Sequence, residues 1–313
     1  MRHKPKHYVE YVLMRAIGGL VGILPYRVAL ALGWGLAWLG FYVLRFRVSA
    51  AEKRIREIFG SNLSPREVRR IAWGSWRNFI FSCVDLLRIP VMSSEWIMCA
   101  VSEDGVDKLR AQVSTGQGGI IATIHMGAWE MAALACLSFK LPLFSIAARQ
   151  KNLLTDAYMN RLRAKTGFET ILRDRHAVKE IVRRIKSGKL LAILPDVRSP
   201  TPALSVQFLG HTANIAAGMG AIARWANAPI FPCVITRVGW GRHVYRVFDP
   251  VWPNMELDKK ADVLRMTQAV FDVFDRCVQA EPEQWFWYNK RWLFDPLPAA
   301  AAPSADDAPP VQE

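Results

Sequence analysis

The fold class is decided by the stretch GGIIATIHMGAWE, residues 118–130. Residues 118–124 form a short, continuous apolar run, which is typical of a strand buried in a parallel sheet. Gly127 then permits a tight turn, and a helical pattern begins at Ala128. A buried strand that leads through a turn into a helix is the repeating unit of an α/β fold.

The same alternation of strand and helix continues along the chain. We expect further strands at 143–148, 170–172, 190–194, 230–236 and 244–248. We expect helices at 104–114, 128–138, 153–166, 177–187, 218–226 and 262–280. The pattern predicts an α/β domain with a mostly parallel central sheet flanked by helices.

The N-terminal segment has a different character. Residues 11–24 are apolar apart from Arg15, and residues 28–44 carry no charge; Pro25 lies between the two runs. The second run is barely long enough to span a thin bilayer. Because both flanks are basic, we favour a helical hairpin broken at Pro25 and embedded from the cytoplasmic side, with a single span as a nearly equal alternative. Two buried helices of a soluble core fit this composition less well.

Three regions follow from these patterns. Residues 1–48 are expected to be membrane-anchoring helices, residues 49–295 the α/β domain, and residues 296–313, rich in Pro, Ala and Asp, a disordered tail. Within the second region, Ser64-Pro-Arg-Glu67 has the form of a helix cap, so a helix is expected to run from there to about Leu87.

Composition narrows the class of partner. The chain has 41 Lys and Arg against 27 Asp and Glu, a net charge of +14, which favours an anionic partner. Its 12 Trp favour a membrane–water interface, and the absence of nucleic-acid-binding motifs argues against nucleic acid. The five cysteines are scattered without CxxC spacing, and HExxH is absent. We therefore expect neither a metal site nor a cofactor.

The first candidate for chemistry is His125, directly after the expected strand 118–124. Ligands of open α/β sheets bind beyond the carboxyl ends of strands, and a histidine there is well placed to act as a general base. Glu130 lies in the next helical turn and is a candidate to hold the other ring nitrogen. The amides of Gly127 and Ala128 are candidates to receive an oxyanion. An equally weighted alternative is a histidine that caps the helix, with Glu130 in solvent.

Other polar residues follow neighbouring strands. Asp196 and Arg198 come after the run 190–194, and Arg149 comes after 143–148. The carboxyl ends of parallel strands share one edge, so these residues are expected near His125, where arginine suits a phosphate. The plainer alternatives are a local Asp–Arg pair and a solvated Arg149.

These residues resemble a known family. His125 and Glu130 match the HxxxxE/D signature of the lysophospholipid acyltransferase superfamily, and HMGAWE is similar to the corresponding motif of the late lipid A acyltransferases. Further blocks resemble that family in the same order along the chain: Arg149, 160–163 with Gly167, 194–196, 206–210, 228–232 and 284–291. The chain departs from the family pattern at Ala128, Val197 and 206–207, which leaves the acceptor and the acyl carrier open.

The resemblance implies an enzyme of the cytoplasmic face of the inner membrane. It would move an acyl chain from acyl carrier protein or acyl-CoA to a hydroxyl of a lipid A precursor or related glycolipid. His125 would be the base, Glu130 would orient it, and Arg149 and Arg198 would hold phosphate or carrier, without a metal or cofactor. Alternatives are a lysophospholipid or other lipid acyltransferase, a thioesterase or lipase, and a non-catalytic membrane adaptor. A serine lipase is disfavoured because GxSxG is absent.

Overall fold

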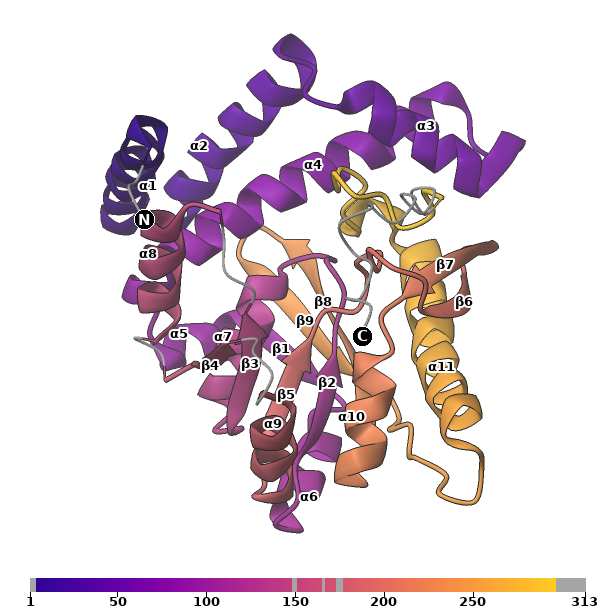
Figure 1. The fold of residues 1–313 in the computed structure, drawn as a ribbon. Coiled ribbons are helices and arrows are strands. Elements are labelled where there is room, and N and C mark those ends of the chain that lie inside the picture. The colour runs from indigo at the N-terminus through magenta and orange to yellow at the C-terminus, as the bar shows by residue number, and fades with distance from the viewer. Residues whose placement is uncertain (1–3, 148–150, 165–166, 173–176, 297–313) are drawn as a thin grey trace, which may run out of the picture.

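A computed structural model describes residues 4–147, 151–164, 167–172 and 177–296. Its centre is a seven-stranded sheet in the order β1-β9-β8-β2-β5-β3-β4, with helices on both faces (Figure 1). All neighbouring strands run parallel except β8 and β9, so the predicted α/β fold class is confirmed. The strands are β1 (Val101–Asp104), β2 (Gly119–Ala122), β3 (Leu143–Ala147), β4 (Glu169–Leu172), β5 (Leu190–Ile193), β8 (Ile230–Gly239) and β9 (Arg242–Val247).

Two layers of helices cover the sheet because successive side chains of a strand point to opposite faces. Ile120 and Ala122 of β2 pack in one core cluster, whereas Ile121 between them packs in the other. The first layer contains α9 (Ala177–Lys186), α10 (Gly218–Ala226) and α11 (Lys259–Ala280); the second contains α5 (Ser94–Ala100), α6 (Asp107–Ser114) and α7 (Trp129–Ser138).

Some elements were not expected from the sequence. A hairpin of β6 (Leu204–Phe208) and β7 (His211–Ile215) lies outside the main sheet and turns at Leu209 and Gly210, which both have positive φ. Strand β1 and helix α5 are also additional. Strand β1 is short, with three of its four residues exposed, so it carries little of the apolar pattern by which buried strands are recognised.

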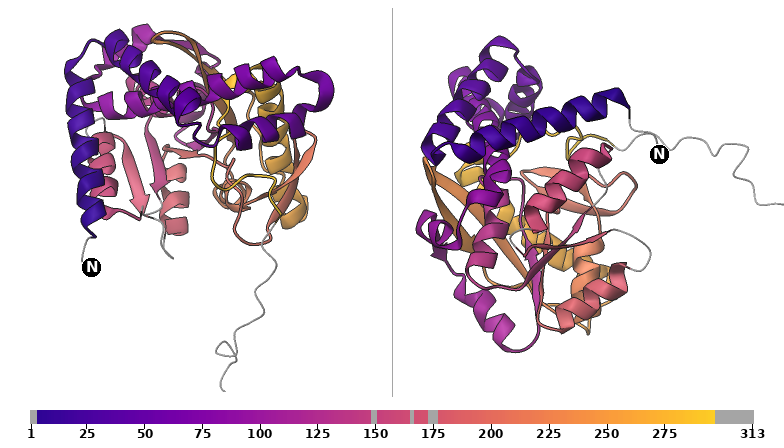
Figure 2. Two further views of the ribbon diagram at one scale, coloured as in Figure 1. Left: turned by 90° about the horizontal axis from the view of Figure 1, so that it is seen from above. Right: turned by 90° about the vertical axis from the view of Figure 1, so that its left-hand side faces the viewer.

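The N-terminal segment forms α1 (Pro5–Ile23), α2 (Tyr26–Trp38), a π-helical turn η1 (Leu39–Val43) and α3 (Val48–Phe59). The break between α1 and α2 lies at Leu24 and Pro25, as predicted. Helix α2 packs against α4 (Pro65–Arg88), and α1 lies beside α8 (Leu153–Ala164) along one side of the molecule (Figure 2). Helix α4 begins with the capping box that was predicted at Ser64 and Glu67.

The outer side of this segment is apolar and exposed. Tyr26–Val43 is 18 residues long and apolar enough to cross a membrane, although a third of it is buried against the protein. We call the exposed residues the apolar N-terminal surface: Tyr8, Val9, Val12, Leu13, Ile17, Leu20, Ile23, Val28, Leu32, Trp34, Leu36, Trp38, Leu39, Tyr42, Val43, Leu44 and Phe46. An apolar area of this extent marks an interaction surface rather than ordinary solvent-exposed protein.

A buried ion pair ties this segment to the sheet. Arg237 of β8 donates to Asp85 of α4 over 2.6 Å, and the Tyr26 hydroxyl donates to the same carboxylate over 2.7 Å. Arg88 donates to the carbonyls of Val21 and Leu24 at the break between α1 and α2. The carboxylate of Asp85 is fully buried, so the donors from Arg237 and Tyr26 replace the water that it loses on folding.

We predict that Asp85→Ala destabilises the protein strongly. The substitution leaves the Arg237 guanidinium buried without its counter-charge, which typically costs about 3–5 kcal/mol of unfolding free energy. Denaturant unfolding in a fixed detergent measures the effect. Glu57→Ala is the control, because its pair with Lys53 is exposed at 3.6 Å and contributes about 0–1 kcal/mol. Equal stability losses in the two variants would contradict the importance of the buried pair.

Candidate active site

The site forms where β2 and β5 end side by side. The parallel register pairs Ala122 with Ile193, so the residues three positions further on, His125 and Asp196, meet beyond the strand ends. Asp196 Oδ1 lies 2.8 Å from His125 Nδ1, and the His125 backbone N–H donates to Asp196 Oδ2 over 2.8 Å. The two residues that the sequence predicted at this edge are therefore in direct contact.

A third donor completes the surroundings of this carboxylate. The indole Nε1–H of Trp285 donates to Asp196 Oδ2 over 3.1 Å. Trp285 is held in turn by the backbone, because the Phe286 N–H donates to the His125 carbonyl over 2.9 Å. Only 2% of the Asp196 side chain is exposed, so three donors from distant segments stabilise a buried negative charge.

The two partners shift each other's pKa. Burial by itself would lower the pKa of His125, but the charge and hydrogen bond of Asp196, with a smaller effect of the Glu130 charge, raise it above its ordinary value. Burial would likewise raise the pKa of Asp196, but the contacts with His125 and Trp285 hold it below its ordinary value. The arrangement thus favours an imidazolium beside a carboxylate.

The other ring nitrogen of His125 is available. Nε2 makes no hydrogen bond to any residue that the structure describes, and 28% of the side chain is exposed. The Trp129 ring packs edge-on against the imidazole with centroids 5.4 Å apart. His125 and Asp196 line a hollow of about 10 Å³, closed by Trp285, Phe286, Asn289, Trp292 and Leu293, which has room for about one water molecule.

Glu130 does not hold the imidazole, contrary to the contact expected from the sequence. It pairs with Arg163 of α8, whose Nη2 donates to Glu130 Oε1 over 2.8 Å. The reason is geometric: helix α7 begins only at Trp129, so His125 precedes the helix and the two side chains do not share a helical face. The carboxylate on Nδ1 belongs to Asp196 instead.

The two amides proposed to receive an oxyanion are already engaged. The N–H of Gly127 donates to the Gln284 carbonyl over 2.8 Å, and that of Ala128 donates to the Ile235 carbonyl over 3.3 Å. Gly127 has φ +58°, and a Cβ there would lie 2.0 Å from the Ile235 carbonyl oxygen. Glycine is therefore required at position 127 for the close approach of two backbone segments. Because both amides already donate to carbonyls, the expectation that they receive an oxyanion was wrong.

Of the two arginines predicted at the site, the structure describes Arg198. Arg198 Nη1 donates to the carbonyls of Asp295 over 3.2 Å and Pro296 over 2.6 Å, so this guanidinium holds the C-terminal segment and does not line the hollow. Arg149 lies outside the described residues.

Two residues with clear structural roles were missed as site residues. From the sequence, Trp285 was noted only within the block 284–291 and Arg163 only within the block 160–163, and neither was proposed as a site residue. Neither carries a local signal, because each acts on a partner far away in the sequence: Trp285 on Asp196, and Arg163 on Glu130. The one hint was that both belong to blocks that resemble the acyltransferase family.

Comparison with known proteins supports that resemblance. Residues 2–294 match the family model of bacterial lipid A biosynthesis acyltransferases. The lipid A biosynthesis lauroyltransferase of Escherichia coli K12 is 22% identical over 279 residues, which cover 88% of this chain and 89% of that protein.

Mycobacterial proteins are also similar. The phosphatidylinositol mannoside acyltransferase of Mycobacterium tuberculosis CDC 1551 is 23% identical over 218 residues, 67% of this chain and 66% of that protein. The protein of the same name from Mycolicibacterium smegmatis is 23% identical over 67% of this chain and 68% of its own length. The chain thus spans about two thirds of these mycobacterial relatives. Because the family model covers nearly the whole sequence, the chain belongs to the bacterial lipid A biosynthesis acyltransferase family.

Proposed function

We propose that this protein transfers a fatty acyl chain from an acyl thioester to a sugar hydroxyl of a membrane glycolipid, with His125 as general base. The observation that carries this proposal is the His125–Asp196 pair, in which Nδ1 lies 2.8 Å from the carboxylate and the histidine lines the hollow. A histidine whose one nitrogen is fixed by a buried carboxylate is prepared to take a proton on the other.

The reaction needs few steps. His125 Nε2 takes the proton of the acceptor hydroxyl as its oxygen attacks the thioester carbonyl carbon. The tetrahedral intermediate then collapses and the carbon–sulfur bond breaks. The leaving thiolate takes from Nε2 the proton that came from the acceptor hydroxyl. Asp196 stabilises the imidazolium between these two transfers and keeps the proton on Nδ1, so the enzyme returns to its starting state without a covalent intermediate.

In this mechanism Glu130 does not contact the reacting atoms. It holds Arg163 beside the first turn of α7, and its negative charge helps to raise the pKa of His125. Arg163 is then a fixed positive charge near the site, suited to a phosphate of the acceptor or donor. We retain Arg149 as a residue that binds phosphate or carrier, whereas Arg198 would act indirectly, by holding the C-terminal segment.

The acceptor class follows from the relatives. The names of the similar proteins point to lipid A and to phosphatidylinositol mannosides, both of which are glycolipids. We propose a lipid A precursor or related glycolipid as acceptor, and acyl carrier protein or acyl-CoA as donor. The excess of 41 basic over 27 acidic residues suits either donor, because carrier proteins are acidic and coenzyme A is a phosphate ester. A lysophospholipid acceptor is the alternative within the same chemistry.

We further propose that the protein acts at the cytoplasmic face of the inner membrane. The apolar N-terminal surface would enter the bilayer interface, with Arg45 and Arg47 at its end near anionic headgroups. Helix α2 packs along α4, so lying in the plane of the membrane preserves contacts that a spanning helix would lose.

We predict that His125→Ala abolishes acyl transfer. Loss of a general base typically lowers the rate by about 100-fold to 10,000-fold. Transfer of labelled acyl chains from acyl carrier protein and from coenzyme A to a bacterial lipid extract measures it, and the labelled lipid identifies the acceptor. His211→Ala, at an exposed hairpin, is the control and should retain activity. Equal product from wild type and His125→Ala would overturn the mechanism.

We predict that Asp196→Asn impairs acyl transfer more than Glu130→Gln does. The reaction needs neutral His125, so the rate rises as pH rises through its pKa. Asp196 raises that pKa more than Glu130 does, so Asp196→Asn should shift the rising limb further towards low pH and lower kcat by about 100-fold or more. Glu130→Gln should lower kcat less. A larger loss of kcat and a larger shift of the pH profile in Glu130→Gln than in Asp196→Asn would show that Glu130, and not Asp196, orients the imidazole.

We predict that charges on the apolar N-terminal surface release the protein from membranes. Leu13→Glu with Leu36→Glu, at side chains 55% and 58% exposed, should move most of the protein from the membrane to the soluble fraction, because carboxylates are costly in the bilayer interface. Val178→Glu, an exposed position on α9, is the control. Unchanged membrane association of the double variant in a flotation assay would contradict the proposed attachment.

A further inference from the structure

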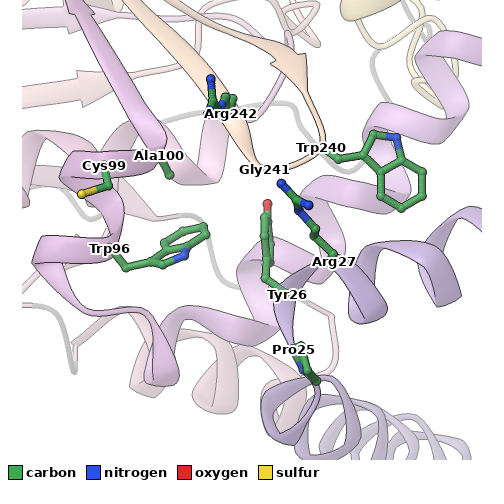
Figure 3. A pocket seen from close by; sticks show the side chains of 9 residues that line it. All are labelled: Pro25, Tyr26, Arg27, Trp96, Cys99, Ala100, Trp240, Gly241 and Arg242. Carbon is green, nitrogen blue, oxygen red and sulfur yellow. The ribbon is translucent and has the colours of Figure 1, made fainter.

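A second and larger hollow lies at the break between α1 and α2. It measures about 310 Å³, within the range of small-ligand sites, and shares no lining residue with the hollow at His125. Figure 3 shows its walls: Tyr26 and Arg27 come from the start of α2, Trp96 from α5, and Trp240 and Arg242 from the turn and strand of β8 and β9.

The walls of this hollow are rigid. The Tyr26 hydroxyl donates to buried Asp85 over 2.7 Å, and the Trp96 ring packs edge-on against Tyr26 with centroids 4.9 Å apart. At Gly241, with φ +80°, a Cβ would lie 2.8 Å from the Tyr26 ring, so only glycine lets the β8–β9 turn approach this closely. The hollow therefore exists before any ligand arrives, which lowers the entropic cost of binding.

The charge of the hollow is positive. Arg27 and Arg242 are both exposed, and neither forms an ion pair with any residue in the described part of the chain. The nine lining residues include no carboxylate. Two free guanidinium groups beside aromatic rings suit a phosphate whose neighbouring part is apolar.

The position of the hollow limits the source of that phosphate. Its lining residue Pro25 lies two positions after Ile23, the most exposed member of the apolar N-terminal surface (87% exposed), and its lining residue Trp240 is 47% exposed. Tryptophan at such a place is typical of the membrane–water interface. If this surface lies in a bilayer interface, as proposed above, a phosphate that reaches the hollow would be carried by a lipid.

We propose that this hollow binds the phosphate headgroup of an anionic phospholipid of the surrounding bilayer, as a site separate from the acyl-transfer site. Arg27 and Arg242 would hold the phosphate, and Trp96 and Trp240 would contact the glycerol and upper acyl chain. This inference rests on the proposed membrane attachment but not on the proposed reaction. Binding here would set the depth at which the protein lies in the interface.

Cys99 provides the readout, because it lines the hollow and is exposed. Cys136 and Cys233 are buried, and burial raises the pKa of the half-buried Cys83 to about 12 and of Cys277 to about 11, so these thiols react slowly. The rate of maleimide modification at Cys99, followed by mass spectrometry, therefore reports occupancy. The probes are monomeric dihexanoyl-phosphatidylglycerol, dihexanoyl-phosphatidylcholine and inorganic phosphate.

We predict that dihexanoyl-phosphatidylglycerol slows modification of Cys99 in the wild type by about tenfold when its concentration is about ten times the dissociation constant. Arg27→Gln with Arg242→Gln should weaken that protection by about tenfold or more in affinity, because two basic contacts are lost. Arg27→Lys with Arg242→Lys should restore part of it. Lys179→Gln with Lys186→Gln on α9 removes the same charge from exposed positions far from the hollow and should leave protection unchanged (Figure 1).

Three results would overturn the proposal. Equal protection by phosphatidylcholine would show that the negative charge is not recognised. Equal protection by inorganic phosphate would make this a site for a soluble phosphate. Full protection of Cys99 in the double glutamine variant would show that neither arginine contributes to binding. Acyl transfer measured on the same proteins separates the two proposals, since a wild type that transfers acyl chains but shows no protection of Cys99 by phosphatidylglycerol refutes only this one.

Discussion

The buried carboxylate of Asp196 is the constraint on which the rest of the site depends. A charge that is 2% exposed must be satisfied by donors, and its donors are the backbone and ring of His125 and the indole of Trp285. These groups lie 71 and 89 residues away along the chain. The end of β2, the end of β5 and the C-terminal segment must therefore come together before any one of them has its final geometry. The same contacts that satisfy the carboxylate also fix the tautomer and the orientation of the imidazole, so they stabilise the strand ends and orient His125 as the proposed base requires.

The second constraint joins the N-terminal segment to this site. Arg237 belongs to β8, the neighbour of β2, and its ion pair with Asp85 holds α4, on which α2 packs. Ser82 of α4 also donates to the Gly127 carbonyl over 2.9 Å, directly beside His125. One helix thus contacts the apolar N-terminal surface on one side and the active-site turn on the other. Under the proposed function, a fixed relation between the two would bring the acceptor hydroxyl to a set height relative to His125.

Much of this could be predicted from the sequence, and the limits have a physical explanation. Continuous apolar runs mark buried strands, so six strands of the main sheet and the position of His125 at a strand end were predicted correctly, whereas β1, α5 and the β6–β7 hairpin were missed. The choice of carboxylate was not, because it depends on the register between β2 and β5, which pairs Ala122 with Ile193 and which no local pattern reveals. Glu130 matches a family motif, yet its side chain pairs with Arg163 on another helix. The amides of Gly127 and Ala128 failed as oxyanion donors for the same reason: their acceptors, Gln284 and Ile235, are distant in sequence.

The small volume at His125 has a consequence for how substrates enter. A hollow of about 10 Å³ admits one water and neither a fatty acyl chain nor a sugar. Trp285 is held by Asp196, so in the proposed reaction the wall that would have to move is the following stretch with Trp292 and Leu293. That stretch is held from outside the site: Arg54 stacks on the Trp292 ring at 4.5 Å and donates to the Trp287 and Asn289 carbonyls, and Arg198 donates to the carbonyls of Asp295 and Pro296. The contacts of Arg198 are exposed to solvent and are therefore weaker than the buried contacts of Trp285. In the proposed reaction, displacement of this stretch from the Arg198 end would leave the contacts among His125, Asp196 and Trp285 in place, so substrate could enter without a change in the orientation of the imidazole.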